Sequence, residues 1–280
     1  MNKKIIITAA LNGAGTTRTL TPCVPITADE IAADAVACAK AGASILHIHV
    51  RDENGKNSMA TEVWKNVIGK VRQCLSATKL DAVLNLTTSG SAWPEDLRVA
   101  HLSVLKPEMC SYDPGSMNWA NSYVFLNTPP FLERLGALCQ ELRIKPEIEI
   151  FDAGMIGNVA HYLKKGVLKA PCHCQLVLDV TGGMPGNLES VAYLLPKLPE
   201  GSTWSITGIG KSYVPMMLAG LAAGCDGLRV GLEDNIFLEK GVMATNAQLV
   251  ARAVELSRVA GREIATAEET RQYLGLVKHE

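Results

Sequence analysis

Short runs of apolar residues alternate along the chain with longer segments in which apolar residues recur every three or four positions. The short runs have the length of buried strands, and the longer segments have the spacing of amphipathic helices. The predicted strands cover residues 5–9, 45–50, 82–87, 109–112, 147–151, 175–180, 204–207 and 227–230. The predicted helices lie between Thr27 and Gly42 and at residues 63–75, 94–105, 131–142, 159–164, 188–195, 214–223 and 248–260.

The order of these elements predicts the fold. Eight strand–helix units of roughly 30–35 residues match a TIM (β/α)8 barrel, with an open doubly wound sheet as the main alternative. No linker or low-complexity run divides the chain, so we expect one TIM-barrel domain over residues 1–280. Thr27 with Glu30 and Thr266 with Glu269 form capping boxes. The second of them begins a short C-terminal helical extension.

Composition excludes several classes of protein. Hydrophobic residues make up 48% of the 280 residues, which is enough for a large core. Lys and Arg number 27 and Asp and Glu 28, so no basic excess indicates a nucleic-acid partner. The apolar runs are far shorter than the ~20 residues of a membrane helix, and no signal-peptide cleavage site follows the first of them. We therefore expect a cytoplasmic protein without a membrane partner, whose eight scattered cysteines are reduced.

His47 and His49 are the strongest candidates for a metal site. They lie two positions apart in a predicted strand, so both side chains point to one face, near the end where a barrel carries its active site. Catalytic zinc takes three protein ligands and keeps one position open. Glu233, just beyond the eighth strand, is the best third ligand. The alternative is a pair of hydrogen-bonded core histidines.

Cys172, His173 and Cys174 also resemble a metal cluster. Adjacent residues of a strand point to opposite faces, and this segment begins the sixth strand, at the other end of the barrel. We therefore expect ordinary packing here.

Other predicted strand ends carry polar groups where a barrel interior is usually apolar. Asn85 and Thr87 lie in the third strand, Ser111 in the fourth, Glu149 in the fifth and Arg229 in the eighth. Polar groups at one end of several strands predict a polar mouth for a small anionic ligand. A pair such as Glu149 with Arg229 could instead be a structural ion pair.

Gly208, Gly210 and Lys211 lie in the predicted loop after the seventh strand. Glycines allow a ligand to approach the backbone, and the next helix start offers free N–H groups. The loops after the seventh and eighth strands commonly bind phosphate in this architecture. We therefore predict that these three residues bind a cofactor, although the motif is weak by itself.

Longer motifs along the chain resemble the β-keto acid cleavage enzymes. They are Ile7-Thr8-Ala9-Ala10, Gly13-Ala14, Thr16-Thr17-Arg18, Pro25-Ile26-Thr27, His47-x-His49-x-Arg51, Lys106-Pro107-Glu108-Met109, Pro146-Glu147-x-Glu149, Gly182-Gly183-Met184, Gly208-Ile209-Gly210 and Gly231-x-Glu233-Asp234-Asn235-Ile236-Phe237. The resemblance covers nearly the whole chain, and the combination is far more specific than any single motif.

The resemblance implies a zinc-dependent TIM barrel that is usually a homotetramer. Such enzymes are acyltransferases, which condense a β-keto acid with the co-substrate acetyl-CoA and release acetoacetate and a new acyl-CoA. By position, His47, His49 and Glu233 would bind Zn²⁺. Asp234, oriented by Arg229, would be the base that removes the C2 proton.

The resemblance also bears on the substrate. Thr87 and Ser111 stand where the family has hydroxyl residues at the substrate, and Glu149 where it has a carboxylate near the arginine. The member that acts on an amino-substituted keto acid has a glutamate just before the Thr-Thr-Arg triplet, and here that position is Gly15. A cationic amine would lose its partner and bind more weakly. We therefore predict a neutral or differently charged β-keto acid.

Two other functions are possible. A zinc-dependent aldolase or hydrolase on the same barrel would act without CoA, although a hydrolase of the amidohydrolase type would need more histidines at later strand ends. A non-catalytic metabolite-binding barrel would bind a ligand without turnover and would be indifferent to His47→Ala or Asp234→Asn.

Overall fold

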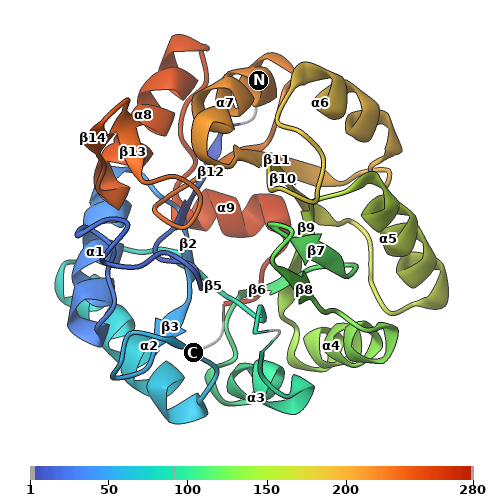
Figure 1. Ribbon diagram of the computed structural model, residues 1–280, viewed down its shortest axis with the longest axis horizontal. Helices are drawn as coiled ribbons and strands as arrows, with labels where there is room; N and C mark the ends of the chain where they lie inside the picture. Colours follow the sequence, from blue (N-terminus) through green and yellow to red (C-terminus); the bar gives the residue numbers. More distant parts are fainter. Residues whose placement is uncertain (1–3, 91, 279–280) are drawn as a thin grey trace.

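Eight parallel strands close into a barrel. The computed structural model describes residues 4–90 and 92–278. The barrel strands are β1 (Ile6–Ala10), β2 (Ile45–Ile48), β5 (Val83–Leu86), β6 (Met109–Tyr112), β9 (Lys145–Ile150), β10 (His173–Leu178), β11 (Thr203–Gly208) and β12 (Gly227–Val230). Strand β1 pairs in parallel with both β2 and β12, which closes the sheet (Figure 1). The predicted TIM barrel is confirmed, and closure excludes the doubly wound sheet.

A helix follows each barrel strand and packs outside it (Figure 1). These helices are α1 (Ala28–Ala41), α2 (Thr61–Ala77), α3 (Glu95–Leu105), α4 (Pro129–Leu142), α5 (Ala153–Lys165), α6 (Leu188–Leu194), α7 (Tyr213–Ala222) and α8 (Asn246–Val259), and α9 (Ala267–Leu274) follows them. The capping box at the start of α1 is present, because Thr27 accepts from the Glu30 backbone and the Glu30 side chain accepts from the Thr27 backbone. The box of Thr266 and Glu269 begins α9 in the same way.

Helix α5 begins earlier than the predicted residue 159. Asp152 caps it, since the carboxylate of Asp152 accepts from the backbone N of Gly154 at 2.8 Å. Gly154 and Gly157 lie in the first turns, and glycine is a poor helix former. The cap therefore starts the helix at Ala153, several residues before the point that the spacing of apolar residues indicated.

The predicted strand at residues 45–50 is divided in two. Strand β2 ends at Ile48, and β3 (Val50–Arg51) pairs antiparallel with β4 (Asn57–Ser58). His49 lies between them: its backbone N donates to Asn12 Oδ1 at 3.2 Å, and its carbonyl accepts from Asn12 Nδ2 at 3.1 Å. The Asn12 side chain thus replaces a neighbouring strand at this residue.

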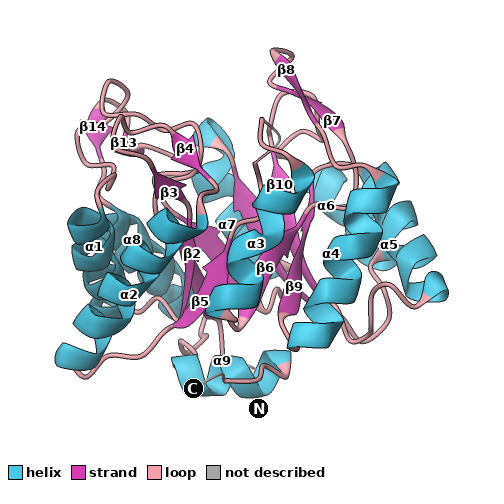
Figure 2. Cartoon of the chain, turned by 90° about the horizontal axis from the view of Figure 1, so that it is seen from below, coloured by secondary structure: helices cyan, strands magenta, loops and turns pink. Residues whose placement is uncertain are grey.

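Three short hairpins stand above the carboxyl ends of the barrel strands, and α9 lies at the opposite end (Figure 2). Besides β3–β4, they are β7 (Met117–Trp119) with β8 (Tyr123–Phe125), and β13 (Phe237–Glu239) with β14 (Val242–Met243). The sequence analysis did not predict them, because strands of two or three residues are too short to show an alternating pattern.

The amino-terminal end of the barrel is closed. Ile6, Ile45, Val83 and Met109 form an apolar cluster together with Ala265 and Leu274 from the C-terminal segment. This packing leaves the opposite end, where the hairpins stand, as the accessible mouth.

The cysteines, His173 and the lengths of the helices complete the description of the fold. The eight cysteines are unpaired. His173 begins β10 and is buried, with Nδ1 2.9 Å from Thr203 Oγ1, so it packs in the core as expected. Among residues 4–90 and 92–278, no helix is both long enough and apolar enough to cross a membrane.

Candidate active site

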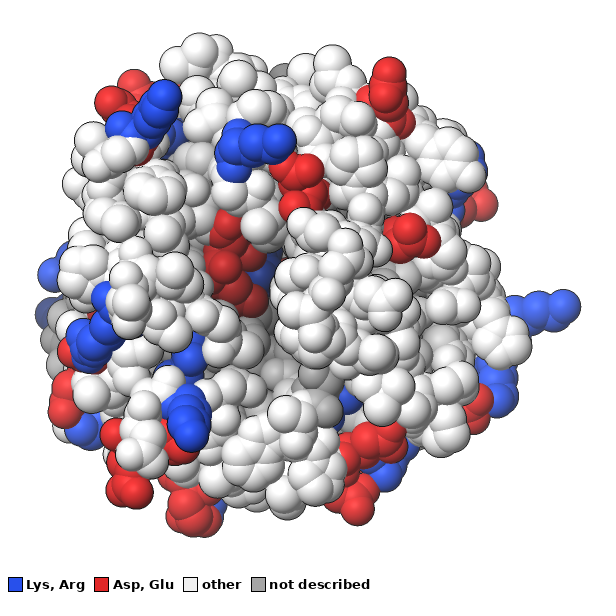
Figure 3. Space-filling view, viewed as in Figure 1, with Lys and Arg blue, Asp and Glu red and all other residues white. Residues whose placement is uncertain are grey.

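A cavity of about 980 Å³ opens at the carboxyl ends of the barrel strands. Its wall includes residues from the loops after β1, β5, β10 and β12 and from the β7–β8 hairpin. Figure 3 shows acidic and basic atoms gathered at the bottom of a hollow in this face. Active sites of TIM barrels lie at this end.

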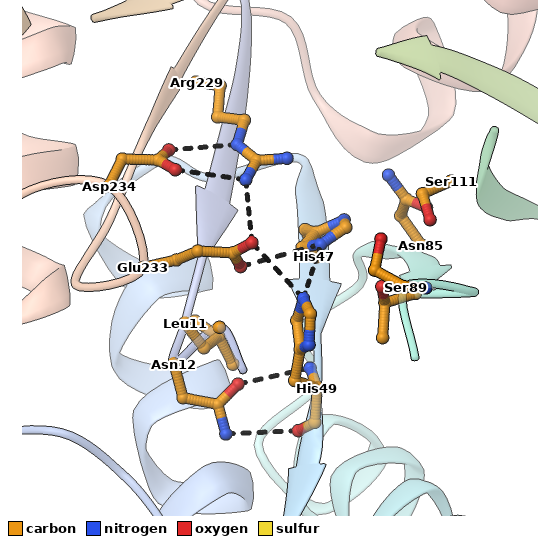
Figure 4. Close-up of polar contacts among 12 residues, drawn as sticks. Leu11, Asn12, His47, His49, Asn85, Ser89, Ser111, Arg229, Glu233 and Asp234 are labelled. Atoms are coloured by element: carbon orange, nitrogen blue, oxygen red, sulfur yellow. Dashed lines mark hydrogen bonds and ion pairs between the residues drawn. The ribbon is translucent and has the colours of Figure 1, made fainter. Parts of the chain in front are cut away.

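Three side chains in the cavity have the spacing of a metal site (Figure 4). His47 Nε2 and His49 Nε2 lie 3.3 Å apart. The carboxylate of Glu233 lies 3.6 Å from His47 Nε2 and 3.2 Å from His49 Nε2. Ligand atoms ~2.0–2.1 Å from a tetrahedral zinc ion are about 3.4 Å apart. The trio therefore fits zinc with one position left open.

The first loop holds Glu233 against the histidines. Gly13 has a φ of 55°, and a Cβ there would lie 2.6 Å from Glu233 Cγ. Only glycine tolerates both the backbone conformation and this close approach. Arg51 fixes the loop by donating to the carbonyls of Asn12 at 3.0 Å and Thr16 at 3.1 Å. The sequence of the first loop is thus tied to the position of Glu233, one of the three candidate ligands.

Arg229 joins the metal trio to two further carboxylates, Asp234 (Figure 4) and Glu149. It donates to both oxygens of Asp234, at 2.9 and 3.1 Å, and pairs with Glu233 at 3.0 Å and Glu149 at 3.2 Å. Burial opposes the charge of Arg229, but these three carboxylates raise its pKa well above the usual range. The guanidinium is therefore a fixed positive charge in the floor of the cavity.

Asp234 has the surroundings of a general base. It is buried, lines the cavity and also accepts from Thr207 Oγ1 at 3.3 Å. Burial raises the pKa of Asp234, while Arg229 opposes this rise by favouring the carboxylate. A carboxylate that stays ionised but has a raised pKa is suited to proton removal. Burial likewise raises the pKa of Glu149 well above its usual range, against the effect of Arg229.

Glu147 lies directly behind the metal trio. It is fully buried, with one oxygen 3.7 Å from His47 Nδ1 and 2.5 Å from Asn85 Nδ2. Burial raises the pKa of Glu147 to about 7. Asn85, which the sequence analysis assigned to the substrate, therefore contacts this carboxylate, because its side chain points into the barrel interior below the mouth.

The predicted hydroxyl residues lie beside the cavity. The described wall includes Ser89 but neither Thr87 nor Ser111. Thr87 Oγ1 accepts from the backbone N of Ser89, and Ser111 Oγ from that of Thr88, each at 2.9 Å. Strand β5 ends at Leu86, so the alternation of faces stops before Thr87. Ser89, which the sequence analysis did not single out, donates to Asp113 at 3.0 Å.

The predicted cofactor residues lie next to the base. Gly208 ends β11, and the backbone N of Gly210 donates to the carbonyl of Asp234 at 2.9 Å. Lys211 is exposed. Ile209 is the residue of this loop that the described cavity wall includes. Cofactor binding by Gly208, Gly210 and Lys211 stays a prediction, while the contact of Gly210 with the backbone of Asp234 helps to position that residue.

An aromatic side of the cavity was not predicted. Trp119, Phe125 and Phe151 line it, and their rings pack edge to face with centroids 5.3–6.5 Å apart. The turn residues Asn121 and Ser122 between apolar runs were a signal for the hairpin that carries two of these rings.

The sequence matches one protein family and is similar to several individual proteins. A sequence model of the family described as beta-keto acid cleavage enzyme matches residues 4–276. The chain is 38% identical over 279 residues to the 3-keto-5-aminohexanoate cleavage enzyme of Fusobacterium nucleatum, covering 99% of this chain and 100% of that protein. It is 35% identical over 300 residues to the 3-dehydrocarnitine:acetyl-CoA trimethylamine transferase of Rhizobium meliloti, covering 99% and 98%.

Solved structures support the fold. A ternary complex of ObcA with a C4-CoA adduct and oxalate superposes with a TM-score of 0.77 at 22% identity, over 91% of this chain and 68% of that chain. Identity at this level indicates a shared fold alone. The family match over residues 4–276, by contrast, includes every residue of the site described above, and so the chain belongs to the beta-keto acid cleavage enzymes.

Proposed function

We propose that this protein is a Zn²⁺-dependent acyltransferase that converts a β-keto acid and acetyl-CoA into acetoacetate and a new acyl-CoA. The observation that carries the proposal is the trio of His47, His49 and Glu233 at tetrahedral spacing, directly beside the pair of Asp234 and Arg229. Family membership and the acetyl-CoA transferase names of several relatives support the choice of reaction. The homotetramer and the cytoplasmic location stay predictions.

Each residue of the site has a separate role in the proposed reaction. A zinc ion bound by the trio would polarise the keto oxygen of the substrate and so acidify its C2 proton. Asp234 takes that proton, and Arg229 holds the carboxylate in place through two hydrogen bonds. Glu149 holds the far side of the Arg229 guanidinium. The buried site keeps these charges away from water, which strengthens their effect on the substrate.

The proposed steps balance without another reactant. The C2 enolate attacks the acetyl carbonyl, a C–C bond forms, and the CoA thiolate leaves. The thiolate then attacks the C3 carbonyl of the same adduct, and the bond between C2 and C3 breaks. The proton held by Asp234 returns to C2. The products are acetoacetate and an acyl-CoA that carries the substituent of the keto acid.

The test is a screen of 3-oxo acids with acetyl-CoA, which follows acetoacetate with and without a chelator. We expect acetoacetate only when both acetyl-CoA and the metal are present. Turnover of a keto acid without acetyl-CoA would instead indicate the aldolase or hydrolase. Binding without any turnover would indicate a metabolite-binding barrel.

Glu147→Gln is expected to weaken zinc binding ~10- to 100-fold, the usual effect of removing a carboxylate behind a metal-binding histidine. His47 Nδ1 and one oxygen of Glu147 have no hydrogen-bond partner within the described chain, and the two side chains approach to 3.7 Å. A charged acceptor there would fix the His47 tautomer and raise its basicity. The Kd is measured on metal-free protein by competition with a chromophoric chelator.

Glu108→Gln is the matched control, because Glu108 is a buried carboxylate at the closed end of the barrel, paired with Arg271. It should leave the zinc Kd unchanged. An unchanged Kd in Glu147→Gln would contradict the role of Glu147. So would two zinc ions per chain, since His47, Glu147 and Glu149 could then form a second metal site.

We propose that the substrate lacks a cationic tail. Gly15 lines the cavity and, as a glycine, brings no carboxylate that could pair with an amine. The name of the relative from Fusobacterium nucleatum indicates an amino-substituted substrate for that protein. That name is said of the relative alone. For this chain, the proposal of a substrate without a cationic tail rests on Gly15 in its first loop.

A further inference from the structure

Three of the four carboxylates in the described wall of the cavity share one cation, Arg229. Glu149, Glu233 and Asp234 all contact Arg229. Asp179 is the remaining Asp or Glu of the described wall, and it accepts from Ser212 Oγ and, at 3.4 Å, from the backbone N of Gly186. No described Lys or Arg other than Arg229 lines the cavity. An anionic substituent on the substrate would therefore find no free cation in the described wall, and a cationic one would find only Asp179, whose partners are uncharged donors. Burying a charge without a partner is costly.

The side of the cavity over β7 and β8 is apolar. Trp119, Phe125 and Phe151 form its centre, and Val177 and Val180 of the β10 segment continue it. Figure 3 shows this division. Charged residues lie in the hollow, whereas the surface beside it, over β7 and β8, is formed by uncharged residues. We call these five residues the aromatic wall. Apolar surface of this kind binds apolar groups by removing them from water.

The aromatic wall is held in place by contacts outside the rings. The backbone N of Ala120 donates to the carbonyl of Thr181 at 2.9 Å, which ties the β7–β8 hairpin to the loop after β10. Arg98 donates to the carbonyl of Leu126 at 2.8 Å, just after β8. A side chain at Gly182 would collide with the carbonyl of Asn118. A wall that is already ordered loses little entropy when a ligand binds.

On the basis of the proposed function, we infer that the aromatic wall binds the C4-and-beyond substituent of the keto acid, so that the enzyme selects 3-oxo acids with uncharged, apolar tails. The carboxylate and keto groups then face the metal trio, at the polar side of the cavity. The tail extends toward Trp119. The acyl-CoA product carries this same tail.

The experiment uses the zinc-loaded full chain and a fixed acetyl-CoA concentration. The apolar series is 3-oxopentanoate, 3-oxohexanoate and 3-oxoheptanoate, and the charged probes are 5-amino-3-oxohexanoate and 3-oxoadipate. We expect kcat/KM to rise about fourfold for each added methylene. The kcat/KM of each charged probe should fall at least ~10-fold below that of 3-oxohexanoate, because the aromatic wall offers the charge of the tail no partner. Equal or better turnover of either charged probe would overturn the inference.

Two variants locate the effect on the wall. Trp119→Ala should abolish the increase of kcat/KM with tail length. Val177→Thr, which is nearly isosteric and less disruptive to the fold, should reduce that increase. Tyr193→Ala, which removes an exposed aromatic ring on α6, should leave it unchanged. A rise in the KM for acetyl-CoA that is the same for every keto acid would instead assign the wall to CoA. Loss of amine turnover in Asp179→Asn would assign the tail to that carboxylate.

Calorimetric titration of the same acids without acetyl-CoA separates this inference from the proposed reaction. If no acid yields acetoacetate, the proposed function fails. An affinity that still increases with tail length would then support the wall, and a flat series would overturn it.

Discussion

Asp234→Asn is expected to lower kcat for acetoacetate formation by about 10²- to 10⁴-fold, the usual contribution of a general base. The substitution is nearly isosteric but removes the basic carboxylate. Asp234 lines the cavity, and its two contacts with Arg229 aim it at the same space that the metal trio faces. Steady-state kinetics with acetyl-CoA and the best 3-oxo acid would measure the loss.

The zinc content and the pH dependence of Asp234→Asn show whether the substitution removes only the basic carboxylate or disrupts the whole site. Zinc should still bind, because Asp234 is outside the trio. In the unsubstituted enzyme, kcat/KM should fall as the pH decreases through the pKa of Asp234, which burial raises above its usual value. This fall in kcat/KM at low pH depends on the Asp234 carboxylate and should be absent from Asp234→Asn. Asp81→Asn is the matched control, because Asp81 pairs with Arg271 away from the described cavity wall, and it should change kcat little. Nearly full activity in Asp234→Asn would remove this residue from the mechanism.

The barrel and the centre of the site could be predicted from the sequence because both rest on short-range patterns. Parallel strands buried on both faces appear as continuous apolar runs, and capping boxes mark the helix starts. His47 and His49 share one face because they lie two positions apart. Glu233 joins them since closure of the barrel places β12 beside β1 and β1 beside β2. The family assignment, the fold and the acyltransferase class are confirmed.

The parts that were missed depend on contacts between distant residues. The side chain of Asn12 interrupts the predicted strand at His49, 37 positions away. The aromatic wall comes from a hairpin, a strand end and a loop, which no local pattern connects. Thr87 and Asn85 were predicted at the substrate from their polarity, whereas burial beside a carboxylate explains Asn85 equally well. Polar residues near a strand end indicate that polar side chains are buried there. Which of these side chains line the cavity depends on where the backbone leaves the strand.

Gly15→Glu is expected to shift the preference toward cationic keto acids by ~10- to 100-fold, the effect of a hydrogen bond to a charged group. Gly15 lines the cavity, is exposed, and has no atom within 4 Å of an added Cβ. Its φ lies outside the left-handed region, unlike that of Gly13 two positions earlier. A side chain at residue 15 therefore fits without backbone strain, and a glutamate there would add a carboxylate to the wall of the cavity. The ratio of kcat/KM for 5-amino-3-oxohexanoate to that for 3-oxohexanoate measures the shift.

Gly15→Gln separates charge from size. It adds the same number of side-chain atoms without the charge, so it should alter the ratio much less than Gly15→Glu does. Raised ionic strength should weaken the new preference if an ion pair causes it, because salt screens exposed charges. The same shift in both variants would mean that residue 15 acts by filling space. No shift in either would mean that the tail of the keto acid does not reach the first loop, and the charge preference would then have to come from Asp179 or from the aromatic wall.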